Sequence, residues 1–208
     1  MQRTALAVIV LVAVALACAI GFLVGRSGRS MPSSSSSEGS GHLVARPRHV
    51  PVFHQLDLTG SNEVVVTVGA PRSVTVYGDD NLVDRVSTVV RAGRLLIGTH
   101  GSFSTRAPMH VEVQVPSLDA IVLSGSGVIR ASGRTARLDV TLTGSGDLQL
   151  ASLAVRDVHA VVEGSGRILV APTGRLDASV PGSGAIMYTG NPTSVVAHVT
   201  GSGAVVHA

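Results

Sequence analysis

Apolar and polar residues alternate along the chain from about residue 51, and Gly-Ser-Gly triplets interrupt the alternation at nearly constant intervals. Aliphatic residues recur at the second and fourth positions before each triplet and at the second position after it. Alternation with a period of two is typical of a strand that buries one face. Each repeat is therefore predicted to be a strand, a corner at the triplet and a second strand. The five triplets are Gly125-Ser126-Gly127, Gly144-Ser145-Gly146, Gly164-Ser165-Gly166, Gly182-Ser183-Gly184 and Gly201-Ser202-Gly203.

The interval between successive triplets is 18 to 20 residues. A fixed period of this length is typical of repeat proteins in which each repeat covers the apolar face of the next. Glycine suits the corner because it adopts positive φ and lets two backbones approach closely. We therefore expect an all-β fold, a β-helix-like solenoid with coils of about 19 residues, in which the triplets are structural corners.

The stretch 51–116 alternates in the same way but carries no triplet. Its strand-like runs are separated by Gly, Pro and Asp/Asn, and Arg91-Ala92-Gly93-Arg94 is predicted to close a hairpin. Because terminal repeats of such folds are atypical, residues 51–116 are expected to cap a solenoid whose GSG repeats fill residues 117–208.

The first 26 residues form a leader. Residues 5–24 are an uninterrupted run of apolar or small residues, flanked by Arg3 and Arg26. The run is long enough to cross a bilayer as one hydrophobic helix and longer than the usual core of a signal peptide, so it favours an uncleaved membrane anchor. A cleaved secretory signal and a lipoprotein signal with Cys18 as the lipidated residue stay open as alternatives.

Residues 27–50 are rich in Ser and Gly and show no apolar periodicity, which predicts a flexible tether. A leader, a tether and an all-β body over residues 51–208 together describe a domain held off a membrane. We therefore expect an exported domain in the cell envelope, in the periplasm or at the cell surface.

The net charge of the chain is +3, and the excess of positive charge lies in the leader and tether. All 16 basic residues are Arg, and residues 51–208 hold eleven of them against twelve acidic residues. This body has no basic excess and only four aromatic side chains, which argues against nucleic-acid binding. Cys18 is the only cysteine, so the body can form no disulfide.

Several short motifs in the body resemble those of a known family. They are the opening Phe53…Leu58-Thr59-Gly60, Val74-x-Val76-x-Gly78-Asp79-x-Asn81-Leu82, Gly93-x-Leu95-x-Ile97, Val115-Pro116-x-Leu118 and the recurrent GSG. In this order they resemble the GIN domain, the head domain of a putative auto-transporter adhesin, over residues 51–208. The resemblance implies a β-helix-like fold in an exported bacterial protein, and it implies no catalytic residues.

Other chemistry fits the residues less well. The triplets lack the lysine and the helix of a phosphate loop, and only Asp147 follows a triplet where a calcium-binding repeat needs an acid in every copy. The eight histidines show no metal-ligand spacing, although His159 and His198 could approach each other across neighbouring coils. We therefore expect no cofactor and no metal.

Asp139, Asp157 and Asp177 recur about once per coil and could line one face, as the carboxylates of a carbohydrate-active β-helix enzyme do. Turn chemistry is the other explanation for these residues, and few aromatic side chains are available to stack on sugar rings. The favoured hypothesis is a non-enzymatic, membrane-tethered module that binds an unidentified protein or glycan through one face. A scaffold that self-associates through an unpaired C-terminal edge strand is a further alternative.

Overall fold

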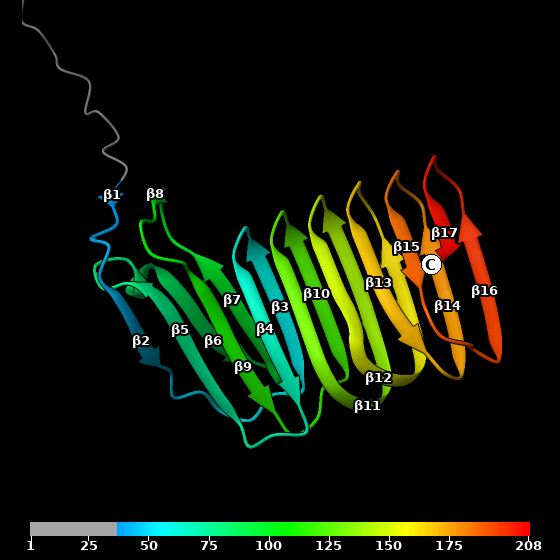
Figure 1. The fold of residues 1–208 in the computed structure, drawn as a ribbon, viewed down its shortest axis with the longest axis horizontal. Coiled ribbons are helices and arrows are strands. Elements are labelled where there is room, and N and C mark those ends of the chain that lie inside the picture. Colours follow the sequence, from blue (N-terminus) through cyan, green and yellow to red (C-terminus); the bar gives the residue numbers. More distant parts are fainter. Residues whose placement is uncertain (1–36) are drawn as a thin grey trace, which may run out of the picture. The chain divides into compact units, whose positions relative to one another are not determined.

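The computed structural model describes residues 37–208, which form strands almost throughout. Fifteen strands belong to one sheet, and two short ones, β1 and β8, pair separately (Figure 1). The strands are β1 (Ser37–Glu38), β2 (Leu43–Pro47), β3 (Gln55–Gly60), β4 (Glu63–Val68), β5 (Ser73–Asp79), β6 (Val86–Arg91), β7 (Arg94–Thr99), β8 (Phe103–Ser104), β9 (His110–Val115), β10 (Ala120–Gly125), β11 (Val128–Gly144), β12 (Asp147–Val162), β13 (Arg167–Pro172), β14 (Arg175–Val180), β15 (Ala185–Tyr188), β16 (Ser194–Val199) and β17 (Ala204–His207). A single turn of 3₁₀ helix, η1 (Val83–Arg85), precedes β6.

The sheet curls so that its two sides face each other across an aliphatic core (Figure 1). One side carries β7, β3, β10, the C-terminal parts of β11 and β12, β14 and β16. The other side carries β5, β9, β4, the N-terminal parts of β11 and β12, β13, β15 and β17. Alternate residues of every central strand point inward, which is why the period-two pattern of the sequence marks the buried positions.

Neighbouring strands in the C-terminal part pair in parallel, and the triplets lie at the turns between the two sides. In the register of β10 and β11, Gly125 is the partner of Gly144. Backbone hydrogen bonds also join successive triplets. The N–H of Ser145 donates to the carbonyl oxygen of Gly125 at 3.0 Å, and the N–H of Ser165 donates to that of Gly144 at 2.9 Å. Equivalent aliphatic side chains therefore stack along the sheet, one strand above the next.

The β-helix-like solenoid predicted for residues 51–208 is wrong. The strands form one curled sheet, similar to a half-barrel, because β11 and β12 continue for 17 and 16 residues through the position where a coil needs a second corner. Antiparallel pairs, β2 with β5, β5 with β9 and β6 with β7, complete its N-terminal part. The period of about 19 residues indicates parallel strands paired in register. Such pairing occurs both in a solenoid and in a curled sheet, so the period does not distinguish the two folds.

The predicted tether ends earlier than residue 50. Residues 43–47 form β2, which pairs with β5, and residues 37–38 form β1, which pairs with β8. The sequence of β2, Leu-Val-Ala-Arg-Pro, is mostly exposed, so it lacks the one-sided apolar pattern that predicts a strand. β2 is held in the sheet by its antiparallel backbone pairing with β5.

The predicted N-terminal helix over residues 5–24, the lipidation candidate Cys18 and residues 27–36 of the tether lie outside the described residues. Within residues 37–208, no helix is long and apolar enough to cross a bilayer.

Candidate functional site

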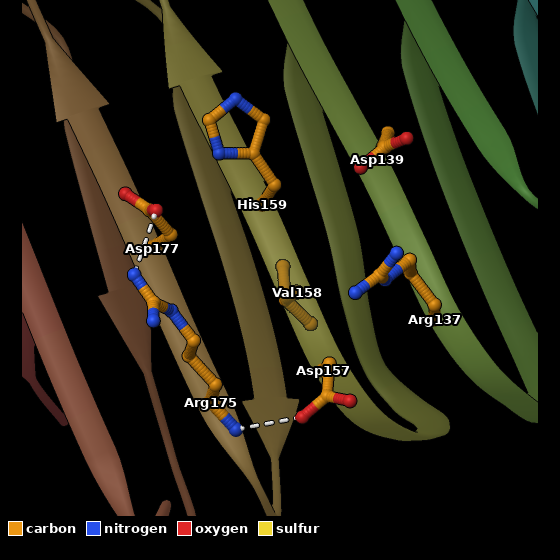
Figure 2. A pocket seen from close by; sticks show the side chains of 7 residues that line it. All are labelled: Arg137, Asp139, Asp157, Val158, His159, Arg175 and Asp177. Carbon is orange, nitrogen blue, oxygen red and sulfur yellow. Dashed lines mark hydrogen bonds and ion pairs between the residues drawn. The ribbon is translucent and has the colours of Figure 1, made fainter.

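A group of charged side chains lies on the outer surface of one side of the sheet, across β11, β12 and β14 (Figure 2). They line an open hollow of about 340 Å³. We call this surface the Arg/Asp face, and its residues are Arg137, Asp139, Asp157, His159, Arg175 and Asp177.

Strand register brings these residues together. Arg137 pairs with Asp157 and Asp139 with His159 between β11 and β12, and His159 pairs with Asp177 between β12 and β14. The residues between them in sequence, Leu138, Val158 and Leu176, are buried in the core. Outward charges are therefore placed in rows by the same alternation that builds the core.

Two of the carboxylates are held by arginines. Asp157 accepts hydrogen bonds from the backbone N–H of Arg175 and from Nε of Arg156, both at 3.0 Å, and Nη2 of Arg175 lies 3.3 Å from Oδ2 of Asp177. The backbone N–H of Arg175 and then the Arg156 side chain hold the pKa of Asp157 below its usual value, against a smaller opposing effect of burial. Asp157 is therefore a carboxylate at neutral pH.

The remaining three side chains of the face are available to a ligand. Among the described residues, the side chains of Arg137, Asp139 and His159 make no hydrogen bond or ion pair, and Figure 2 shows them projecting from β11 and β12. The face thus offers a guanidinium, a carboxylate and an imidazole on a rigid base. This set can form charge-assisted hydrogen bonds with a partner of mixed charge.

Comparison with known families identifies the chain. The family described as "Putative auto-transporter adhesin, head GIN domain" matches residues 52–130 and 120–192. The chain belongs to this family. The GIN-domain resemblance predicted from the sequence is therefore confirmed.

Several solved structures are similar to this GIN domain. A putative adhesin from Bacteroides fragilis is 21% identical, with a TM-score of 0.54, over 82% of this chain and 99% of that chain. A putative lipid binding protein from Parabacteroides distasonis is 19% identical over 82% and 98% of the two chains, with a TM-score of 0.42. A putative cell adhesion protein from Clostridium sporogenes is 14% identical over 80% and 98%, with a TM-score of 0.43. The Bacteroides fragilis structure supports the fold alone. No curated protein matches the sequence.

The three aspartates that suggested an enzyme do share one face of the GIN domain. Asp139 and Asp177 both lie beside His159 in the strand register, and Asp157 lies beside Arg137. A glycoside hydrolase needs one carboxyl group whose pKa is raised so that it can act as an acid. Asp157 has the opposite shift, since the groups around it stabilise the charged form.

The histidine pair considered from the sequence is not brought together. His159 lies on β12 and His198 on β16, with β14 between them, and His198 pairs with Ser179 rather than with the partner of His159. Within residues 37–208, no group of three or more His, Cys, Asp or Glu side chains is arranged to hold a metal ion.

The triplet corners line a second, shallower hollow of about 300 Å³ between Ser145, Ser165 and Ser183. Their backbone N–H groups already donate to carbonyls of the neighbouring strand, as Ser183 N does to Gly164 O at 2.9 Å. A phosphate cradle needs such groups free, so the geometry of the corners is that of a turn.

Sequence reasoning missed one polar site, the buried carboxylate of Asp79 at the end of β5. It is 0% exposed and accepts hydrogen bonds from the backbone N–H groups of Gly41 at 2.6 Å, Arg106 at 3.0 Å and Ala107 at 3.2 Å. We call this arrangement the Asp79 clasp, because it joins the segment before β2 to the segment after β8. Burial raises the pKa of Asp79, but these N–H donors outweigh it and lower the pKa below its usual value.

Proposed function

We propose that this GIN-domain protein is an exported, membrane-tethered and non-enzymatic adhesin-like module that binds a protein partner through the Arg/Asp face. The observation that carries the proposal is the set of unpaired side chains, Arg137, Asp139 and His159, on in-register strands. A rigid base lowers the entropy lost on binding. The family description and the names of similar structures support an adhesin-like role and a location outside the cytoplasm.

A protein partner fits this face better than a glycan. The face contains no aromatic side chain, and sugar rings are commonly held by aromatic stacking. Its charges are instead of both signs, with Arg137 on β11 paired in register with Asp157 on β12, which suits a partner surface that also carries both signs of charge. The apolar run 5–24 supports the membrane tether.

Adhesion of cells that produce the full chain tests this function. The cells are applied to surfaces coated with fibronectin, collagen, mucin or purified peptidoglycan, and bound cells are counted. We expect adhesion to at least one protein-coated surface. The variant Arg137→Ser, Asp139→Asn should lower the affinity behind it by about a hundredfold, because two charge-assisted contacts of about 1.5 kcal/mol each are lost.

The matched control changes charges on the other side of the sheet. Arg130→Ser with Asp147→Asn alters the outer surface of β11 and β12 away from the Arg/Asp face, and it should leave adhesion unchanged. Adhesion that persists after deletion of residues 51–208 contradicts the proposal. Release of reducing sugar from a polysaccharide, abolished by Asp139→Asn, establishes the enzyme alternative in its place.

A further inference from the structure

The two strands at the C-terminal end of the sheet leave the core uncovered. Val195 and Val199 on β16 continue the inward-facing columns of Leu176 and Val180 on β14. The inner pair is 0% exposed, whereas Val195 is 39% and Val199 is 42% exposed. On the other side of the sheet, Val205 of β17 continues the inward column of Ile186 on β15, and Val206, on the outward row, is 46% exposed. Three of the six large apolar side chains that are exposed within residues 37–208 therefore lie on these two strands.

The backbones of the same strands have an unpaired edge. β16 pairs with β14 alone, and β17 pairs with β15 alone. Their outer N–H and C=O groups form a template for another strand. Neither strand contains Asp, Glu, Arg or Pro, which are the residues that natural edge strands use to prevent such pairing.

The N-terminal end of the sheet also has edge strands, β2 and β6, but it differs in its core and in the side chains of these strands. The core there is covered, since Leu82, Val83 and Val86 are at most 2% exposed. Edge strand β2 contains Arg46 and ends in Pro47, and edge strand β6 ends in Arg91. Strands with these residues are poor partners. If the N-terminal end of a second copy covered these exposed columns, the C-terminal end of that second copy would still expose its own core and edge strands.

We propose that β16 and β17 form an interface with the same two strands of a second copy of this chain, related by a two-fold axis. An antiparallel pair of β16 strands centred on Ala197 places Val195 of one copy opposite Val199 of the other. All three inward positions, Val195, Ala197 and Val199, then continue the aliphatic columns into the partner. Because the interface uses the same patch on both copies, it closes at a dimer.

Charge permits this pairing. The β16 and β17 segments carry no side chain that is ionised at neutral pH apart from any protonated histidine, so two identical edges do not repel each other. The antiparallel pairing joins both sides of the sheet to their counterparts, and the core becomes continuous across the interface. The proposal is independent of the Arg/Asp face, which lies on β11, β12 and β14.

Self-crosslinking at the centre of the interface tests the proposal. The full chain with Cys18→Ser carries Ala197→Cys as its only cysteine, is purified in detergent and is then oxidised. A residue on the two-fold axis lies opposite itself at a Cα separation of about 4.5–5.5 Å, which is within disulfide reach. We expect a covalent dimer for Ala197→Cys and none for the control Thr143→Cys, which lies on β11. Absence of the dimer for Ala197→Cys overturns the proposal.

Sedimentation equilibrium of the full chain in detergent provides a second measurement. The wild type should sediment as a dimer, and Val199→Asp should sediment as a monomer, because the change places a charge in the paired core. Val89→Asp is the matched control, since Val89 is similarly exposed at 45% but lies on β6 at the other end, and it should stay dimeric. Far-UV circular dichroism checks that Val199→Asp is folded. If this variant is unfolded, the result of the Ala197→Cys crosslinking alone decides whether the proposal holds. A wild-type monomer, or oligomers larger than a dimer, overturns the two-fold arrangement.

Discussion

Gly144 lies at a corner where two backbones nearly touch. Its φ is +121°, and a Cβ atom at this position would lie 2.5 Å from the carbonyl oxygen of Gly125. Both the dihedral angle and the contact exclude a larger residue. The corner therefore depends on glycine for two independent reasons.

We predict that Gly144→Val lowers the free energy of unfolding by more than about 1 kcal/mol, because a β-branched residue rejects positive φ. Urea unfolding followed by circular dichroism measures the change. Ser145→Ala, at the exposed middle position of the same triplet, is the control and should change stability by less than about 0.5 kcal/mol. Equal effects of the two substitutions contradict this account of the corner.

Asp79 is predicted to stabilise the fold only while it is ionised. Its folded pKa lies below the unfolded value of about 3.9, so its contribution is complete above that value and is lost as the pH falls through the folded pKa. Thermal unfolding between pH 7 and pH 2 should show stability that decreases below about pH 4.

Asp79→Asn should lower the melting temperature at pH 7 by several degrees. The amide NH₂ group must face at least one of the backbone N–H donors of Gly41, Arg106 and Ala107, so two donors oppose each other. The variant should also lose part of the acid sensitivity of the wild type. Asp119→Asn, at an exposed position, serves as the control and should leave both properties unchanged.

At the scale of elements, the hairpin of β6 and β7 was predictable from local sequence. Arg91 pairs with Arg94 across a two-residue turn, as the segment Arg91-Ala92-Gly93-Arg94 predicted. Ala92 and Gly93 both have positive φ, 50° and 74°, which are the angles of a type I′ turn. Ala92 is the only described residue other than glycine with positive φ.

Ala92→Asn should therefore stabilise the protein by about 0.5–1 kcal/mol, because asparagine tolerates the left-handed region better than alanine does. The midpoint of urea unfolding measures this gain. Ala92→Val should have the opposite sign, since a β-branched side chain is strained at positive φ. A lower midpoint for the asparagine variant contradicts the assignment of the turn.

Other elements could not be predicted from local patterns. The period-two alternation marks which residues of β10 and β14 are buried, such as Leu123 and Leu176, but it is equally compatible with parallel and antiparallel neighbours. The continuous strands β11 and β12 and the antiparallel pairs around β5 follow from pairing between distant segments. The wrong fold prediction has this cause.

Of the two polar sites, the Arg/Asp face could be predicted from the sequence and the Asp79 clasp could not. The recurrence of Asp139, Asp157 and Asp177 predicted that they share a face, and strand register brings them together. The Asp79 clasp was missed because its three donors lie 38, 27 and 28 residues away and are backbone groups, which carry no mark in the sequence. Asp79 itself resembles an ordinary turn residue after a strand.

At the scale of the whole molecule, the two proposed surfaces are compatible. The two-fold pairing of β16 continues each side of the sheet into the corresponding side of the partner, so the Arg/Asp faces of both copies point the same way. Two linked sites can hold a multivalent partner far more strongly than one. A dimer-disrupting change at Val199 should therefore weaken cell adhesion without altering any residue of the Arg/Asp face.

The Asp79 clasp also determines how the domain bears mechanical load. A pull that enters through residue 37 reaches β1 and then the clasp before it reaches β2, the first strand of the large sheet. Of the three N–H donors, that of Gly41 lies on the pulled segment, whereas those of Arg106 and Ala107 hold the Asp79 carboxylate from the segment after β8. In an optical trap with the handle at residue 37, Asp79→Asn should lower the force of the first rupture while later events stay unchanged. The wild-type clasp thus delays peeling of the sheet from its N-terminal end.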